Sequence, residues 1–246
     1  MRWVRKKSKV PVSSLRIGTD IHTHLLPGVD DGRFTFGSAA ETLSQMYDKG
    51  IDRVYLTPHM IAGLYENSHE KLHDALKGVK DCVGTATIPE ISLGAEYMID
   101  ETLLPYIEKS GDDILTVLDC HVLIEMSYYG MSPQLFDVVA VLSEMGYKPI
   151  LAHPERYLYM DGHMADFDRL HNMGCTFQLN MLSMTGIYGE TSIRIMNNLF
   201  ERSLYRYAGS DIHSQQQFEQ IYNSHIDEKI ALAGERALLW GINISK

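Results

Sequence analysis

The sequence predicts an α/β fold in which parallel strands close into a barrel. Short runs rich in apolar and β-branched residues alternate with segments whose apolar residues recur at helical spacing. No internal repeat or proline- and serine-rich linker interrupts this alternation, which favours one domain built on a parallel sheet. Six of the seven predicted strands end in side chains able to bind a metal ion. These side chains would converge at the mouth of a barrel, whereas an open doubly wound sheet, the alternative fold, would string them along one edge.

The elements follow a basic N-terminal stretch in regular order. We expect residues 1–16 to form a flexible arm that precedes a single domain over 17–246. The predicted strands are, in chain order, 17–22, 51–57, 91–97, 121–126, 148–153, 175–181 and 205–210. The predicted helices between them are 38–49, 68–81, 134–145, 164–173 and 190–201. The segment from 214 onward is expected to add one or two helices and a short terminal strand over 237–244.

The composition disfavours several classes of protein. The 246 residues carry a formal net charge of −10, which argues against nonspecific nucleic-acid binding. The three cysteines suggest no disulfide framework and fit a reducing compartment, so we expect a cytoplasmic protein. No stretch approaches the roughly 20 apolar residues of a membrane span, and the basic N-terminus lacks the apolar core of a signal peptide. The sequence therefore predicts no stable membrane insertion, and it favours no particular oligomeric state.

The most informative segment is the run DIHTHLLPGVDDG over residues 20–32. His22 and His24 are two residues apart, so on a strand both imidazoles would project from the same face. The following leucine, proline and glycine end the strand and turn the chain, which brings Asp30 and Asp31 back toward the same end. This spacing predicts a metal site; the alternative is a strand edge with solvated histidines and an Asp-Gly turn.

The other strand ends extend this candidate site. The full set of predicted metal ligands is His22, His24, Asp31, His59, Glu96, Glu125, His153, Asp211 and His213. Five imidazoles and four carboxylates without a thiolate suit manganese, iron or zinc and argue against a closed structural zinc site. Nine ligands exceed what one ion takes, so we expect two to three divalent ions, most favourably manganese. Their surplus positive charge would attract an anion, and a phosphate ester is the natural substrate for such a cluster.

Each of these residues also has a structural explanation. A strand-end histidine commonly packs without binding a ligand, and Glu96 and Glu125 could be charges at a barrel rim. However, each glutamate follows an apolar run, and a glutamate there is costly to bury without a partner. The joint pattern therefore favours the metal site.

These motifs resemble the polymerase and histidinol phosphatase (PHP) superfamily of metal-dependent phosphoesterases. The resemblance is closest to the bacterial PHP-type protein-tyrosine phosphatases of capsule and exopolysaccharide loci. The opening run is followed in order by T-P-H at 57–59, G-x-E at 94–96, H-P-E-R-Y at 153–157 and S-D-x-H at 210–213. The motifs thus span nearly the whole chain.

The resemblance implies a distorted seven-stranded (β/α) barrel of PHP type, similar to a TIM barrel, with three metal ions. It implies hydrolysis of phosphotyrosine, usually on the cytoplasmic tail of a membrane tyrosine kinase that governs capsular or exopolysaccharide synthesis. Glu96 would bridge ions, one shared with His22, His24 and Asp211. A second ion would use His59 and Glu125, and the third Asp31, His153 and His213.

Arg156 matches the phosphate-binding arginine of this family; the alternative is a rim salt bridge, for example with Glu155. His59 and Asp211 are the two candidates for the proton donor to the leaving phenolate. Members of the family often carry another arginine a few residues after the D-x-H motif, but residues 214–218 read SQQQF here. Arg33 or Arg194 is a possible substitute.

Other readings remain open. One is a small-molecule phosphoesterase such as a histidinol-phosphate phosphatase, and another is a catalytically idle metal-binding module on a kinase complex. The H-E-x-x-H string at 69–73 could bind zinc, but we expect its helix to pack outside the barrel. Tyr128 and Tyr129, which follow Glu125, could stack on a phenol ring or simply pack at the rim.

Overall fold

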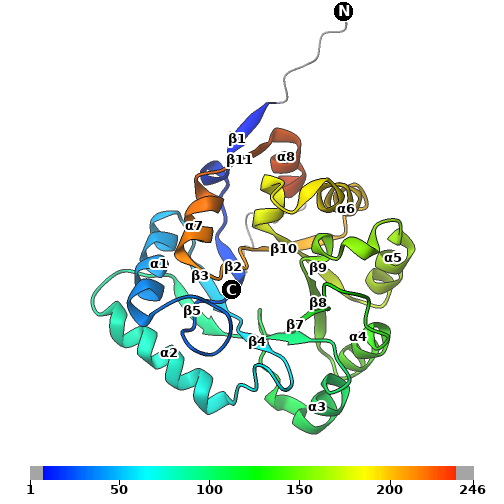
Figure 1. The fold of residues 1–246 in the computed structure, drawn as a ribbon, viewed down its shortest axis with the longest axis horizontal. Coiled ribbons are helices and arrows are strands. Elements are labelled where there is room, and N and C mark those ends of the chain that lie inside the picture. Colours follow the sequence, from blue (N-terminus) through cyan, green and yellow to red (C-terminus); the bar gives the residue numbers. More distant parts are fainter. Residues whose placement is uncertain (1–7, 237–246) are drawn as a thin grey trace, which may run out of the picture.

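The computed structural model describes residues 8–236, in which strands surround a common centre and helices cover the outside (Figure 1). The parallel strands are β2 (Thr19–Thr23), β3 (Arg53–Leu56), β4 (His59–Met60), β5 (Glu90–Leu93), β6 (Glu96–Met98), β7 (His121–Glu125), β8 (Lys148–Ala152), β9 (Thr176–Asn180) and β10 (Tyr205–Gly209). The α-helices are α1 (Phe36–Asp48), α2 (His69–Val83), α3 (Leu103–Ser110), α4 (Leu135–Glu144), α5 (Met164–Asn172), α6 (Gly189–Glu201), α7 (Gln215–Tyr222) and α8 (Glu228–Arg236). The alternation of strands and helices confirms the predicted mixed α/β fold with parallel strands.

The strands form two separate parallel sheets, so the closed seven-stranded barrel predicted from the sequence is wrong. One sheet has the order β10-β9-β8-β7-β6-β4, and the other has the order β2-β3-β5. Between β10 and β2, the described residues contain only one isolated parallel bridge, from Thr23 to Ile212. The predicted segments still follow one another around the centre in sequence order (Figure 1).

Interruptions in two of the predicted strands explain why the sheets separate. The predicted strand 51–57 ends at Leu56, and β4 begins only after Thr57 and Pro58; proline has no N–H to continue the hydrogen-bond ladder. The predicted strand 91–97 is likewise interrupted at Gly94, where a β-carbon would lie 2.8 Å from a methyl group of Val117. The chain therefore contributes β3 and β5 to one sheet, and β4 and β6, which follow these interruptions, to the other.

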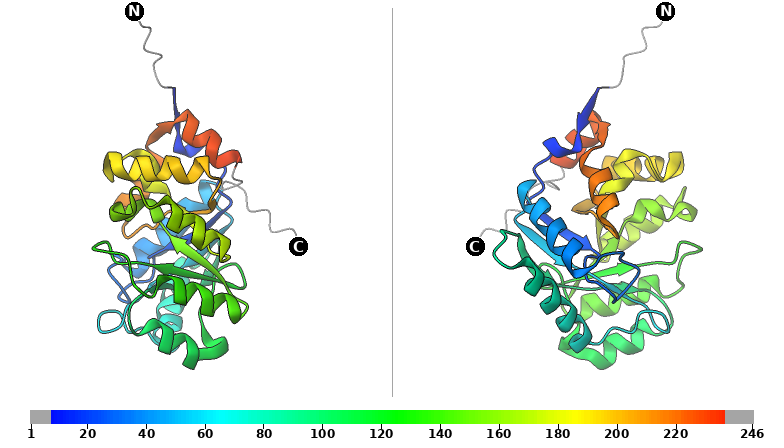
Figure 2. Two further views of the ribbon diagram at one scale, coloured as in Figure 1. Left: turned by 90° about the vertical axis from the view of Figure 1, so that its right-hand side faces the viewer. Right: turned by 60° about the vertical axis from the view of Figure 1, so that its left-hand side comes forward.

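The N-terminal stretch differs from the expected flexible arm over residues 9–15. Strand β1 (Lys9–Pro11) pairs antiparallel with β11 (His225–Asp227), and the short 3-10 turn Val12–Ser14 follows it. Val12 is completely buried. Strands β1 and β11 and helix α8 lie together at one end of the molecule (Figure 2). Three-residue strands carry no readable alternation, so sequence patterning could not find this pairing.

The predicted helices are present within a few residues of their expected ends. Helix α1 begins after Thr35, whose side chain forms a capping box with Ser38, and α2 begins after the capping residue Ser68. Helix α3 was not predicted, because it is short and contains Pro105 in its first turn. Helices α7 and α8 match the helices expected after residue 214; the expected strand over 237–244 lies outside the described residues.

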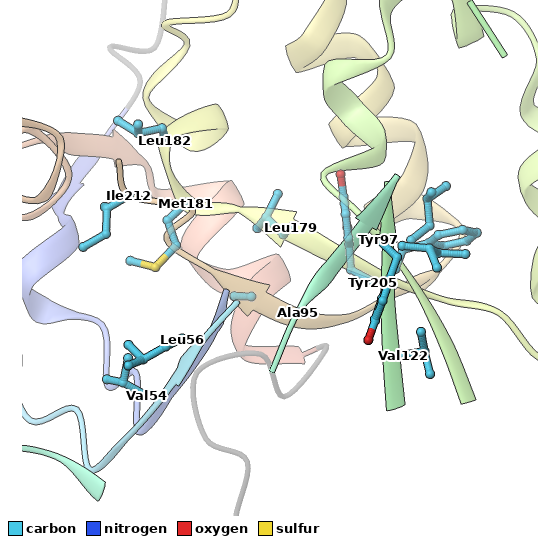
Figure 3. Close-up of a cluster of buried hydrophobic side chains, with 14 of the residues drawn as sticks. Val54, Leu56, Ala95, Tyr97, Val122, Leu179, Met181, Leu182, Tyr205 and Ile212 are labelled. Carbon is cyan, nitrogen blue, oxygen red and sulfur yellow. The ribbon is translucent and has the colours of Figure 1, made fainter. Parts of the chain in front are cut away.

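Alternate residues along each strand face two different hydrophobic clusters. Residues such as Val54, Leu56, Val122 and Leu179 belong to the large cluster that also includes side chains of the outer helices (Figure 3). The opposite strand faces bury a second cluster: Ile21, Tyr55, Val117, Leu118, Leu123, Ile150, Ala152 and Tyr207. Glu125 lies two residues after Leu123, so it projects from the face that carries this second cluster. Candidate site residues thus lie just beyond an apolar layer.

The close approach of β10 to β2 gives a testable consequence at Gly209. A β-carbon there would lie 2.6 Å from the β-carbon of His22 and 3.0 Å from Nε2 of Gln178. We expect Gly209→Ala to lower the free energy of unfolding by about 1–3 kcal/mol, because neither neighbour can retreat without disturbing the strand ends. Urea denaturation measures this change. Gly18→Ala is the matched control, since no heavy atom lies within 4 Å of its added carbon; an equal loss in both variants would contradict the close-approach argument.

Candidate metal centre

The structure brings all nine predicted ligands to the carboxyl ends of the strands. Eight of them, all except His153, form three overlapping groups of atoms within 4.8 Å of one another, which we name centres A, B and C. Centre A contains His22, His24, Glu96 and Asp211; centre B contains His59, Glu96 and Glu125; centre C contains His24, Asp31, His59 and His213. Glu96 is common to A and B, as expected for a bridging carboxylate.

Centre A is completely enclosed. Nε2 of His22 lies 3.1 Å from Oε2 of Glu96 and 3.4 Å from Oδ1 of Asp211, and its side chain has no solvent exposure. Nε2 of His24 lies 3.3 Å and 3.2 Å from the same two oxygens. Four potential ligand atoms therefore face one another in a space closed to solvent.

Centre B contains polar atoms that the protein leaves without hydrogen bonds. Nδ1 of His59 is 2.8 Å from Oε1 of Glu125 and 3.1 Å from Oε2 of Glu96. All three atoms are buried, and none has a hydrogen-bond partner among the described residues. Unsatisfied buried polar atoms are rare and costly, so their convergence at one point calls for a ligand.

Centre C is the open end of the cluster. Oδ1 of Asp31 lies 3.2 Å from Nε2 of His213 and 3.5 Å from Nε2 of His59, and the Asp31 side chain is 54% exposed. The expected third member, His153, does not belong to this group. Its Nε2 lies 3.0 Å from Oε1 of Glu96, because the strand that carries it, β8, is far from the loop of Asp31 in the strand order.

The spacing of these atoms fits divalent metal ions. Bonds of about 2.0–2.2 Å from an ion to nitrogen and oxygen ligands place neighbouring ligand atoms about 3.0–3.5 Å apart. The distances in centres A and B fall near that range. The mixture of imidazole and carboxylate without cysteine is the donor set of catalytic zinc, manganese or iron sites.

The charged residues of the cluster shift one another's pKa values. Burial raises the pKa of Glu96, but His22 and His59 outweigh this effect and hold it well below its usual range. Burial lowers the pKa of His59, yet Glu96 and Glu125 overcome it and raise it to about 10. The pKa values of His22 and His24 also rise, against the effect of burial, because of Glu96 and Asp211. The carboxylates of the cluster therefore favour the protonated forms of His22, His24 and His59.

Several buried residues orient the candidate ligands, and most were not singled out by the sequence. Nδ1 of His22 hydrogen-bonds Oε1 of Gln178 at 3.0 Å, and Nδ1 of His24 hydrogen-bonds Oδ2 of Asp30 at 2.8 Å. These bonds fix the rings with Nε2 toward centre A, as is usual for metal-binding histidines. Asn180 donates to Asp211 at 2.8 Å. The Asp-Asp-Gly run could have pointed to Asp30 as a residue that orients a ligand. Gln178 and Asn180 lie in an ordinary strand pattern, so nothing in the sequence marks them for this role.

Two ligand-bearing turns adopt left-handed backbone conformations. His153 has φ 35° and Asp211 has φ 53°, directly after β8 and just after β10. Non-glycine residues rarely adopt positive φ, and such strain concentrates at functional sites. The abrupt turn keeps both side chains over the strand ends instead of continuing along the strands.

Arg156 lies against the cluster, but its partner is not Glu155. One terminal nitrogen of Arg156 pairs with Oδ2 of Asp211 at 2.6 Å, and the guanidinium carbon lies 4.7 Å from the ring centre of Tyr128 and 4.6 Å from that of Tyr188. Glu155 is instead completely buried, where it accepts hydrogen bonds from Tyr205, Ser183 and the backbone of Asn180. The suggested rim salt bridge between Arg156 and Glu155 is therefore absent from the described contacts.

The two suggested substitutes for the missing arginine differ in position. The guanidinium of Arg194 is engaged by both carboxylate oxygens of Asp161. Arg33 is exposed, and its backbone N–H donates to the carbonyl of His213 at 2.6 Å. Residue 33 is therefore the one tied directly to the candidate metal centre.

The H-E-x-x-H string lies at the start of α2, as expected for an outer helix. His73 is exposed, His69 is half-buried, and neither belongs to a candidate metal group among residues 8–236. Leu72 between them is buried in the large hydrophobic cluster. In the described part of the chain, no helix combines the length and apolar character required to cross a membrane.

Comparison with known proteins gives consistent results over most of the chain. The family model for capsular polysaccharide synthesis, CpsB/CapC, matches residues 18–224. The tyrosine-protein phosphatase CpsB of Streptococcus pneumoniae is 28% identical over 203 residues, covering 79% of this chain and 82% of that protein. The tyrosine-protein phosphatase YwqE of Bacillus subtilis is 26% identical over 197 residues, covering 79% and 77%.

A solved structure shows the same fold. It comes from work on YwqE from Bacillus subtilis and CpsB from Streptococcus pneumoniae, described as metal-dependent tyrosine phosphatases. Its TM-score is 0.73 at 24% identity, and the match covers 89% of this chain and 92% of that chain.

The raised pKa values of His22, His24 and His59 predict how metal binding depends on pH. An ion entering centre A or B must displace protons from His22, His24 or His59, so the apparent affinity should rise with pH by about tenfold per unit for each proton displaced. Calorimetric titration with Mn²⁺ at pH 7, in two buffers of different ionisation enthalpy, measures the protons released. A binding enthalpy that does not change with the buffer would contradict this charge assignment.

Proposed function

The chain belongs to the CpsB/CapC family of capsular polysaccharide synthesis, and from this premise we propose that it is a metal-dependent protein-tyrosine phosphatase. The observation that carries the proposal is the convergence of centres A, B and C beside Arg156, a cation able to bind phosphate. In this proposal, the substrate is a phosphotyrosine protein, such as the tail of a membrane tyrosine kinase that governs capsular or exopolysaccharide synthesis. The unpaired cysteines support a cytoplasmic location.

Eight of the nine predicted ligands, all except His153, would hold two to three divalent ions, with manganese favoured and iron or zinc as the other candidates. His22, His24 and Asp211 would bind at centre A, and His59 and Glu125 at centre B, with Glu96 shared between them. Asp31 and His213 would complete centre C, while His153 would support Glu96 from the side of β8. Bound ions would supply Lewis-acid stabilisation of phosphoryl charge and would activate water as a nucleophile near neutral pH.

Arg156 would bind the phosphoryl group. A guanidinium has five N–H donors, and the contact with Asp211 uses one terminal nitrogen, so other donors remain to contact phosphoryl oxygens. The rings of Tyr128 and Tyr188 lie against the guanidinium and restrict its orientation. Arg33, beside His213, is the candidate for a second contact to the phosphate.

The leaving phenolate needs little protonation, because its pKa is about 10. Of the two candidate donors, Asp211 is unsuitable: despite its burial, His22, His24 and Arg156 hold its pKa well below the usual range, so it stays ionised. His59 is the other candidate, but its Nδ1 faces centre B and its Nε2 faces Asp31 in centre C, so ions bound at both centres would leave it no proton to donate. We therefore assign the larger catalytic contribution to Arg156.

Exposed apolar side chains around the centre favour a protein substrate over a small polar phosphoester. They occur on the segments that follow β4, β7, β8 and β9, at the same ends of the strands as the metal centre. The residues are Leu64, Tyr128, Tyr129, Met131, Leu158 and Ile187, and Tyr129 is fully exposed. An apolar rim suits contact with another polypeptide and gives no benefit to a compound such as histidinol phosphate.

The direct test is turnover by protein purified without chelator and loaded with Mn²⁺. We expect hydrolysis of a phosphotyrosine peptide with a kcat/KM at least tenfold higher than that for histidinol phosphate, and loss of activity after chelation. Equal or better turnover of histidinol phosphate would favour a small-molecule phosphatase. No turnover of either compound by fully loaded protein would favour a metal-binding module without catalytic activity.

Substitution of Arg156 tests the phosphate contact. Arg156→Lys keeps the charge but loses the planar pair of donors, so kcat/KM for the peptide should fall by about 30- to 1,000-fold, or about 2–4 kcal/mol. Metal content, measured by elemental analysis of the same preparation, should not change because Arg156 is not a ligand.

Arg194→Lys is the matched control, since Arg194 is engaged with Asp161 on the surface. Turnover by Arg156→Lys close to that of the control would refute the phosphate contact. Loss of metal from Arg156→Lys would give the residue a structural role through Asp211 instead.

A further inference from the structure

A second cavity lies directly beside the candidate metal centre. It has a volume of about 410 Å³ and is lined by residues that include Met60, Ile61, Tyr65, Met98, Leu103 and Tyr106. We name it the β4–β6 pocket, because Met60 belongs to β4 and Met98 to β6. Its lining comes mainly from the segment that follows β4 and from helix α3.

The pocket and the metal centre share two strands. His59 and Met60 are consecutive residues of β4, and Glu96 and Met98 are two residues apart on β6. In each strand, the first residue contributes to centre B and a following one lines the pocket. Met60 follows His59 directly, so their side chains point to opposite faces of β4. The pocket residue that contacts the centre is Tyr65, whose ring stacks on that of His59.

The segment that closes the pocket is fixed to the metal centre. The ring of Tyr65 stacks on that of His59, with centroids 5.9 Å apart and an interplanar angle of 14°. The amide of Asn67 donates to the carbonyl of His59 at 2.9 Å and to that of Val29 at 3.0 Å. Residues 61–67 are thus held in a defined position relative to centre B, so the pocket is preformed.

The chemistry of the pocket selects an uncharged, apolar ligand. Among the described residues that line it, only Glu66 carries a charge, and one of its carboxylate oxygens accepts a hydrogen bond from the backbone of Gly63. Methionine and aromatic side chains form much of the wall, and methionine adapts well to varied apolar shapes. A phosphate or another anion would meet no cation there.

We propose that the β4–β6 pocket receives an apolar side chain of the substrate polypeptide close to its phosphotyrosine, and thereby sets a sequence preference. This inference rests on the proposed phosphatase function. In an extended peptide, side chains two residues apart lie on one face at a spacing of about 7 Å. The pocket wall begins at Tyr65, whose ring centroid lies 5.9 Å from that of His59, so a side chain two residues from the phosphotyrosine can reach it. The occupant is therefore a leucine, methionine or aromatic side chain about two residues from the phosphotyrosine.

The test uses Mn²⁺-loaded protein and phosphotyrosine peptides in which each of the three positions on either side carries leucine, alanine or aspartate. We expect kcat/KM to be about tenfold or more higher for leucine than for alanine at one position, with aspartate lower still. p-Nitrophenyl phosphate, which has no flanking residues, reports phosphatase chemistry independently of this preference.

Variants then assign the preference to the pocket. Ala62→Trp fills the pocket from its exposed edge, and Thr102→Arg introduces a charge at another exposed lining position. In each variant the leucine-to-alanine ratio should fall toward one. Met145→Glu, which replaces an exposed apolar residue after α4, should keep the ratio of the unmodified protein.

Three outcomes would overturn the proposal. Turnover of p-nitrophenyl phosphate and all peptides without any sequence preference would exclude the pocket as a side-chain site. A preference for aryl over alkyl phosphate esters that is lost in Ala62→Trp, again without sequence preference, would assign the pocket to the phenol ring. Absence of turnover of every ester by loaded protein would reject the phosphatase function together with this inference.

Discussion

The buried carboxylate of Glu96 is the interaction on which the rest of the site depends. It is completely buried, and its two oxygens lie within about 3.3 Å of nitrogens from four histidines: His22, His24, His59 and His153. Burying such a charge is favourable only with close opposite charges or metal ions. The histidines that surround Glu96 come from the ends of β2, β4 and β8. These strands must therefore end around this one residue.

The backbone around Glu96 shows the cost of this convergence. His153 and Asp211 adopt positive φ, and Gly209 lets β10 approach His22, where an added β-carbon would lie 2.6 Å from that of His22. Asp211 also links two functions, because it belongs to centre A and pairs with Arg156. Oδ1 of Asp211 faces the histidines of centre A, while Oδ2 pairs with Arg156, so one carboxylate fixes the arginine beside the centre.

The sequence predicted which side chains converge at the strand ends, because each position is fixed by local geometry. His22 and His24 lie on one strand, and the other candidate ligands lie at or just beyond strand ends, which parallel strands bring together in any order. The sequence could not show whether the strands close into a barrel, because this depends on how Pro58 and Gly94 interrupt the hydrogen-bond ladder between neighbouring strands. The grouping of His153 with Glu96 depends on strand order, and the roles of Gln178 and Asn180 on contacts between distant segments. None of these leaves a signal in spacing or composition.

The central claim is that these strand-end side chains form one multinuclear metal centre. Anomalous diffraction from crystals grown with Mn²⁺, collected above and below the manganese absorption edge, tests it most directly. We expect two or three anomalous peaks, with Glu96 within about 2.0–2.4 Å of two of them. A single peak, or peaks only at other residues such as His69 and His73, would contradict the account.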